Sequence, residues 1–226
     1  MRKGFRWLAA AIAAASFSPL LHATIIDFEG DALTGLYFPG DSFAQNGFRM
    51  TQGFDAGFVD IGQGLAPVAP TNNATQFYFN SNDGDLLFET ESGDPFNLNG
   101  FSAAFVPIAN SNNPPQTIGI VAVATTMTGD VFGTIFGFGD TSSATHGYPF
   151  LTFNSVADFG RFNNLRSVDF FTCAIVSGNP CAAPTRNNGQ FALDNVNVTA
   201  VPEPETWALM SLGLVAIATI RRRRSR

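Results

Sequence analysis

Residues 190–198 read QFALDNVNV, and this stretch decides the fold. Successive side chains of a β-strand point to opposite faces of its sheet. The apolar residues form two pairs of opposite phase, Phe191 with Leu193 and Val196 with Val198. No regular strand can bury both pairs on one face, but one extra residue restores the phase. The sequence therefore predicts a β-bulge at Asp194-Asn195 in the closing strand of a sheet.

The composition of the chain extends this prediction to the whole domain. The chain has 226 residues, of which 45% are hydrophobic and only 13% charged, enough to bury the core of one domain. The stretch from Thr24 to about Pro204 contains 22 of the 24 Phe, 20 of the 22 Gly and 18 Asn. Aromatic residues favour pleated strands, while Gly and Asn favour tight turns. Many short strands joined by turns are expected.

The pattern predicts eleven strands: Thr24–Phe28, Gly47–Thr51, Phe58–Ile61, Thr75–Asn80, Asp85–Glu89, Phe96–Val106, Gln116–Thr125, Val131–Gly137, Phe150–Asn154, Leu165–Thr172 and Gln190–Thr199. No segment of this region keeps a 3.6-residue period, so nothing helical is expected to cover a parallel sheet. We expect an all-β fold, an antiparallel jelly-roll-like β-sandwich over residues 24–200.

Charge is segregated along the chain. Eight of the 12 basic residues lie within the first six or the last six positions. Between Trp7 and Ile220 the net charge is −14, and there is no lysine. Nucleic-acid binding needs clustered Lys or Arg to neutralise phosphates, so we expect no nucleic-acid partner.

The first 23 residues have the order of a secretory signal peptide. Basic residues precede an apolar run from Trp7 to Phe17, and Leu21-His22-Ala23 offers a small residue at the cleavage point. The alternative is an uncleaved anchor, but Ser18-Pro19 breaks the run before it could span a bilayer. We expect residues 1–23 to be removed on export.

Residues 201–226 have three parts. The triplet Pro202-Glu203-Pro204 comes first, the apolar segment 206–220 follows, and the cluster Arg221-Arg222-Arg223-Arg224-Ser225-Arg226 ends the chain. As a helix the apolar segment would measure only about 22 Å, short of a hydrocarbon core of roughly 30 Å. Arginine snorkelling and local thinning of the bilayer close that gap, so a transmembrane helix is expected over 206–220, with the arginines on the cytoplasmic side.

This order of triplet, short apolar helix and arginine cluster resembles the PEP-CTERM sorting tail. The resemblance implies export by a Gram-negative bacterium that forms exopolysaccharide and biofilm, transient insertion into the inner membrane, and cleavage near the triplet by an exosortase. The protein would then reach the cell surface or the extracellular matrix. The spacing Gln190-Phe191-x-x-Asp194 also looks like a PEP-CTERM subfamily marked by a QFxxD motif, which implies no function of its own.

Two cysteines, Cys173 and Cys181, are separated by seven residues that include Gly178, Asn179 and Pro180. An even number of cysteines in an exported chain predicts a disulfide, here closing a short loop. The alternative, a pair of metal-binding thiols, lacks further soft ligands nearby.

Candidate catalytic residues are few. Once His22 leaves with the signal peptide, His146 is the one imidazole of the mature chain, which excludes multi-histidine zinc centres. No Gly-x-Ser-x-Gly elbow accompanies it. Glycoside hydrolysis needs only two carboxylates, but spacing selects none of the 18 present. A non-catalytic protein is expected, with glycoside hydrolase as the alternative.

The first and last strands carry a metal hypothesis. Phe28-Glu29 and Leu193-Asp194-Asn195-Val196 resemble the terminal strands of jelly-roll carbohydrate-binding modules. That resemblance implies a structural calcium held by Glu29 and Asp194. The alternative is that Asp194 caps the bulge through local backbone hydrogen bonds.

Three functional classes remain. The first is a glycan- or matrix-binding sandwich in the exopolysaccharide matrix, the second a purely structural surface protein, and the third a secreted polysaccharide hydrolase. The mature domain has no Trp, so the three tyrosines, Tyr37, Tyr78 and Tyr148, are the aromatics expected to stack on sugar rings. The sequence identifies no ligand.

Overall fold

The computed structural model describes residues 23–66, 68–108, 117–139, 141, 146–176, 179–184, 188–201, 211 and 213. Residues Ala23–Ala200 form one compact unit. Residues 1–22 of the predicted signal peptide, the triplet Pro202-Glu203-Pro204 and the arginine cluster lie outside the described residues, as does nearly all of segment 206–220. Ala23, the last residue of that predicted peptide, begins the first strand.

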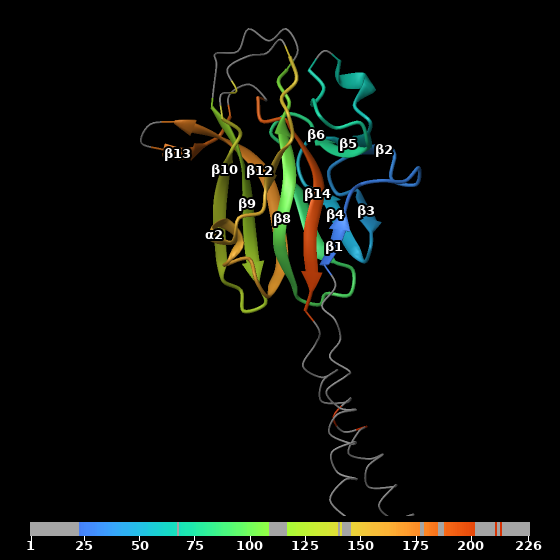
Figure 1. Cartoon of the computed structure of the whole chain (residues 1–226), viewed down its shortest axis with the longest axis vertical. Helices are drawn as coiled ribbons and strands as arrows, with labels where there is room; N and C mark the ends of the chain where they lie inside the picture. The colour runs from blue at the N-terminus through green and yellow to red at the C-terminus, as the bar shows by residue number, and fades with distance from the viewer. Residues whose placement is uncertain are drawn as a thin grey trace, which may run out of the picture. The chain divides into compact units, whose positions relative to one another are not determined.

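The unit is an antiparallel β-sandwich, which confirms the predicted fold class. The strands of one layer run, in spatial order, β10 (Val131–Gly137), β9 (Ile118–Thr126), β12 (Leu165–Val176), β7 (Leu86–Thr90), β4 (Phe48–Gln52) and β3 (Ser42–Gln45), with β13 (Asn179–Ala182) beside the end of β12. We call this layer one. Figure 1 shows β10 at its outer edge, beside β9.

Layer two runs β11 (Leu151–Phe153), β8 (Phe96–Phe105), β14 (Phe191–Ala200), β6 (Phe77–Asn80), β5 (Gly57–Asp60) and β2 (Gly35–Tyr37). β1 (Ala23–Ile26) pairs with the second half of β14. A single residue pair, Leu165 with Phe96, joins the two layers. Short helical turns, η1 (Gln63–Leu65) and α2 (Val156–Phe159), complete the unit.

The core between the layers is rich in phenylalanine. Phe101 of β8 illustrates the packing, because its ring contacts those of Phe136, Phe153, Phe159 and Phe170 at centroid distances of 5.0–5.7 Å. Edge-to-face contacts of this kind contribute about 0.5–1.5 kcal/mol beyond area burial. Phe159 belongs to α2, so this short helix supplies a core residue between β8 and β10.

The bulge predicted in the closing strand is confirmed. Phe191, Leu193, Val196 and Val198 are all fully buried in the same core, although their phases differ. The register of β14 against β8 shifts between Asp194 and Asn197, and Asn195 has a φ of 49°. Asn tolerates this left-handed conformation better than most residues, so the extra residue is accommodated at low cost.

The strand prediction misses three elements, β2, β3 and β13. Each has only three or four residues and lies at an edge or beside the end of one longer strand. Short edge strands carry little hydrophobic pattern, because one side of their backbone faces no partner and few of their side chains reach the core.

Candidate functional site

The bulge lies where β14 changes its partner. On one side β14 pairs with β8 along most of its length. On the other side residues 191–193 pair with β6, and residues 196–199 pair with β1. Asp194 and Asn195 therefore face the gap between two partner strands, and polar side chains from the ends of both strands gather there.

The Asp194 carboxylate is 2% exposed and closely held. Oδ1 accepts a hydrogen bond from the Asn195 backbone N–H at 2.7 Å. Oδ2 accepts from Asn195 Nδ2 and from Asn73 Nδ2, both at 2.8 Å. The pKa of Asp194 is raised to about 7, and burial is the main cause. The hydrogen bonds from Asn195 and Asn73 lower this pKa, and the charges of Glu29 and Asp27 raise it. The bulge-capping role of Asp194 is therefore confirmed.

Glu29 and Asp194, the two predicted calcium ligands, face the same gap. Glu29 Oε1 accepts from the Gln76 N–H at 3.1 Å, and Asp27 Oδ1 accepts from Gln45 Nε2 at 2.8 Å. We call Asp27, Glu29, Gln45, Asn73, Gln76 and Asp194 the Asp194 corner. Among the described residues, no three His, Cys, Asp or Glu side chains form a group suited to a metal ion. The calcium prediction stays untested.

A second polar group lies on the face of layer one that points away from the core. Phe170 and Val168 of β12 face the core, so the alternate residues Ser167, Asp169 and Phe171 face outward. The strand registers bring further side chains beside them. We call the whole set the outer face: Arg49, Thr51, Asp85, Leu87, Glu89, Val121, Val123, Thr125, Ser167, Asp169 and Phe171.

Two carboxyl groups meet on this outer face. Burial, then the charge of Asp85, then a hydrogen bond with Asp85 together raise the pKa of Asp169 to about 7. Asp169 Oδ1 is buried and has no hydrogen-bond partner. Asp85 Oδ1 accepts from the Phe54 N–H at 2.7 Å. A Cβ built on Gly53 would lie 2.2 Å from Asp85 Oδ2, so the Asp85 side chain needs glycine at that position.

Two phenylalanines belong to the segments that hold this carboxyl pair. Phe54 donates its backbone N–H to Asp85, and its side chain is 72% exposed, the highest exposure among the described phenylalanines. Phe171 is half-buried on the same face. Neither these two phenylalanines nor the two aspartates were expected as site residues. Gly53-Phe54, two residues after the predicted strand Gly47–Thr51, is the local signal that could have indicated Phe54.

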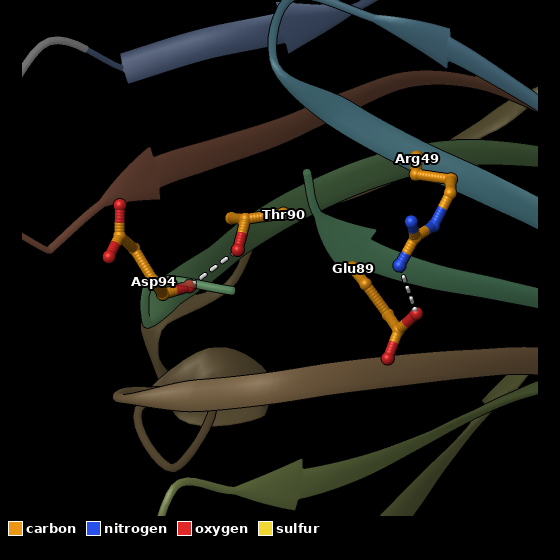
Figure 2. Close-up of polar contacts among 4 residues, drawn as sticks. All are labelled: Arg49, Glu89, Thr90 and Asp94. Carbon is orange, nitrogen blue, oxygen red and sulfur yellow. Dashed lines mark hydrogen bonds and ion pairs between the residues drawn. The ribbon is translucent and has the colours of Figure 1, made fainter. Parts of the chain in front are cut away.

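Charged pairs extend the outer face toward β4. Arg49 Nη2 lies 3.3 Å from Glu89 Oε2, and the two side chains are 47% and 30% exposed (Figure 2). Figure 2 also shows Thr90, the residue after Glu89. Its hydroxyl donates to the Asp94 carbonyl at 2.6 Å. The Thr90 bond closes the turn after β7, whereas the ion pair faces solvent.

Two of the three tyrosines are buried and cannot form a sugar-stacking surface, so the prediction is wrong for Tyr78 and Tyr148 and stays untested for Tyr37. Tyr78 is fully buried, and its hydroxyl donates toward Gln52 Oε1 and Asn80 Oδ1 in the interior. Tyr148 is 8% exposed. Tyr37 is partly buried, and its ring centroid lies 4.4 Å from that of Phe43. Its hydroxyl donates to the Leu33 carbonyl. Tyrosine in a strand turns toward the core whenever its phase matches the apolar face, and the sequence alone did not resolve that phase.

The structure contains Cys173 and Cys181 as thiols, without the predicted disulfide. Cys173 is buried in β12, and Cys181 is exposed in β13. Burial first, then a hydrogen bond with Cys181, raises the pKa of Cys173 to about 12. The thiols are thus neighbours, and a disulfide between them remains a prediction for the exported protein.

Comparison with known proteins identifies the tail. Residues 200–224 match the family model of the PEP-CTERM protein-sorting motif. The chain therefore carries the sorting signal of an exported surface protein, as the sequence predicted. No helix among the described residues is long and apolar enough to cross a membrane, and the predicted helix over 206–220 lies almost entirely outside them. No curated protein matches the chain.

Solved structures match over most of the domain at low similarity. A Clostridium thermocellum endo-1,4-beta-D-xylanase fragment in complex with xylohexaose has 11% identity and a TM-score of 0.34, covering 78% of this chain and 28% of its own. A Bacteriophage CBA120 tailspike protein has 15% identity and a TM-score of 0.27, with 77% and 20% covered. The family 11 carbohydrate-binding module from Clostridium thermocellum, bound to a mixed-linked tetrasaccharide, has 13% identity and a TM-score of 0.28, with 80% and 97% covered.

Proposed function

We propose that this protein is a non-catalytic, exosortase-processed component of an exopolysaccharide matrix, and that its outer face binds glycan. The observation that carries the proposal is the position of Phe54. Phe54 is 72% exposed and its backbone N–H donates to Asp85, one of the carboxyl groups of the outer face, in a chain that carries an export signal.

The chemistry of the outer face suits a sugar polymer. Phe54 and Phe171 offer apolar surfaces for the C–H face of a sugar ring. Asp85, Asp169 and Ser167 offer acceptors for its hydroxyl groups, and Arg49 offers donors.

A glycan array with the exported protein tests the proposal. We expect binding that Phe54→Ala weakens at least tenfold, equivalent to about 1.4 kcal/mol. Phe38→Ala is the matched control, because Phe38 is 56% exposed just after β2 in layer two. Binding that the two variants leave equal would overturn the outer face as the site. No binding on the array favours a purely structural surface protein, and release of shortened sugars favours a hydrolase.

Processing by exosortase, with passage through the inner membrane, is the second part of the proposal. Replacing Pro202, Glu203 and Pro204 by Ala is expected to leave an uncut form in the inner membrane. Mass spectrometry of the wild-type extracellular protein should find no peptide from Trp207 to Arg226. An intact arginine tail on secreted material contradicts this part and leaves the glycan test unaffected.

The proposal retains calcium as a structural ion of the Asp194 corner. Calcium prefers six to eight oxygen ligands. Glu29 and Asp194 would supply carboxylate oxygens, and Asp27 lies close enough for its charge to affect Asp194. A cation there would relieve the repulsion that raises the pKa of Asp194.

A further inference from the structure

The edge strands of the sandwich differ sharply in length. β2, β3 and β11, at the ends of the layers, have three or four residues each. β10, the remaining edge, has seven residues and pairs with β9 through seven consecutive residue pairs without a register shift. Proteins commonly protect edges by shortness, charge, proline or bulges, because a bare edge pairs with other chains. β10 reads VFGTIFG and contains no charge, proline or bulge, and the segment 156–162 packs on its core-facing rings Phe132 and Phe136.

The open side of β10 follows from its hydrogen bonds. Phe138 donates its N–H to Ile118, and Asp130 accepts at its carbonyl from Thr126. In an antiparallel pair, alternate residues point both backbone groups to the same neighbour. The even-numbered residues of β10 therefore bond to β9. The odd-numbered residues Val131, Gly133, Ile135 and Gly137 point their N–H and C=O groups outward, and no described residue bonds to them.

The outward residues are self-complementary. If two β10 strands pair antiparallel about a two-fold axis through Thr134, Val131 faces Gly137 and Gly133 faces Ile135 of the other copy. Each large side chain then lies opposite a glycine. All four outward residues occupy the hydrogen-bonded positions of the new ladder, so each pair exchanges two backbone hydrogen bonds.

Charge also favours this edge for contact between copies. The region between the terminal basic clusters has a net charge of −14, so two copies repel each other over most surfaces. β10 and its neighbour β9 contain no charged residue. A strand without charged side chains places no like charges directly opposite each other when two copies meet.

We infer that two copies of this chain associate through β10, joining their layers one into a single continuous sheet. The contact is isologous and centred on Thr134, so it closes as a dimer and does not propagate. Both outer faces then lie on one sheet. The inference does not depend on glycan binding.

Cysteine cross-linking in the full-length exported protein tests the register. Thr134→Cys places the two new thiols directly opposite each other at the symmetry axis. Val131→Cys faces Gly137 of the other copy, so it has no thiol opposite it. On a non-reducing gel we expect Thr134→Cys to shift to twice the mass of the reduced band, while Val131→Cys and the wild type stay at the monomer position. The three proteins share Cys173 and Cys181, which makes the wild type the control for native thiols.

A monomeric Thr134→Cys overturns the inference, and so does equal dimer formation by Val131→Cys, which indicates random collision. Val131→Lys supplies a second measurement by sedimentation of the full chain. It adds a charge at the open edge, where Val131 is 65% exposed, and should remove the dimer. Leu36→Lys, at a residue 56% exposed on the short edge strand β2, should leave the dimer unchanged. A dimer that survives Val131→Lys, or is lost equally in both variants, contradicts the β10 contact.

Discussion

Asp194 and Asp169 are two aspartates whose pKa values are each raised to about 7, and burial is the main cause at both. Their surroundings differ. Asp194 is held by three N–H donors at the bulge of β14. Asp169 faces another carboxyl group, and its Oδ1 has no partner. A raised pKa is therefore not a signature of one role. The donors around Asp194 indicate a structural carboxylate, whereas Asp169 is buried beside a second carboxyl group and one of its oxygens has no donor.

The largest expected effect is at Asp194. Replacing Asp194 by Ala leaves the Asn73 amide and the Asn195 backbone N–H without their acceptor. The substitution removes three hydrogen bonds to Asp194, each of which contributes about 0.5–1.5 kcal/mol to the free energy of unfolding. Chemical denaturation should show a large loss for Asp194→Ala and a much smaller change for Asp169→Ala. Equal losses at the two sites would erase the distinction between them.

The second prediction concerns calcium, which should affect the stability contributed by Asp194 but not that contributed by Asp169. If the Asp194 corner binds calcium, an ion at a hundred times its dissociation constant stabilises the fold by about 2.7 kcal/mol. Chelation should lower the melting temperature of the wild type and of Asp169→Asn. Glu29→Gln and Asp194→Asn should be destabilised already and indifferent to chelator. If the wild type melts at the same temperature with calcium and with chelator, the calcium site does not exist. Capping of the bulge is then the sole role of Asp194.

The pH dependence of Asp169 gives a smaller effect of opposite sign. Its folded pKa of about 7 exceeds the ordinary value of 3.8, so between these pH values the folded state keeps a proton that the unfolded state has released. Stability therefore falls as pH rises through that window, by at most about 1.4 kcal/mol per pH unit. Asp169→Asn removes this loss, so the variant should gain stability relative to the wild type as pH rises from 4 to 8. Melting curves from pH 4 to 8 would contradict this if both proteins keep the same slope.

The smallest effect is expected at the Arg49–Glu89 pair on the same outer face. This pair is solvent-exposed, so Arg49→Gln should cost no more than about 0.5 kcal/mol and should matter less in high salt. Its denaturation midpoint at low and high salt provides the measurement. A loss as large as that of Asp194→Ala would mean that the outer face contributes to folding as much as the bulge does.

Local sequence predicted the features that depend on neighbouring residues. The bulge follows from the phase of apolar residues within nine positions, and most strands follow from the same alternation. The sorting tail follows from three parts in order within 26 residues, and the family match over residues 200–224 agrees with it. These features were accessible because each is encoded within one short stretch of chain.

The outer face could not be predicted in this way. Asp85 and Asp169 are far apart in sequence and meet because β7 and β12 pair in one particular register. The tyrosines were expected at the surface, yet Tyr78 is fully buried. All four residues of its strand, β6, are buried, so both faces of that strand are covered. A strand covered on both sides shows no apolar alternation from which to assign a face.

By itself, the sequence determined the strand-rich sandwich, the bulge at Asp194-Asn195 and the export tail, because alternation, turn residues and terminal charge are local properties of the chain. Only the tertiary structure decided which side chains meet: Asp85 with Asp169, Asn73 with Asp194, and β10 with no neighbour beyond β9 among the described residues. Strand order and register set these contacts, and both depend on pairing between segments distant in sequence, whose free energy no single segment contains.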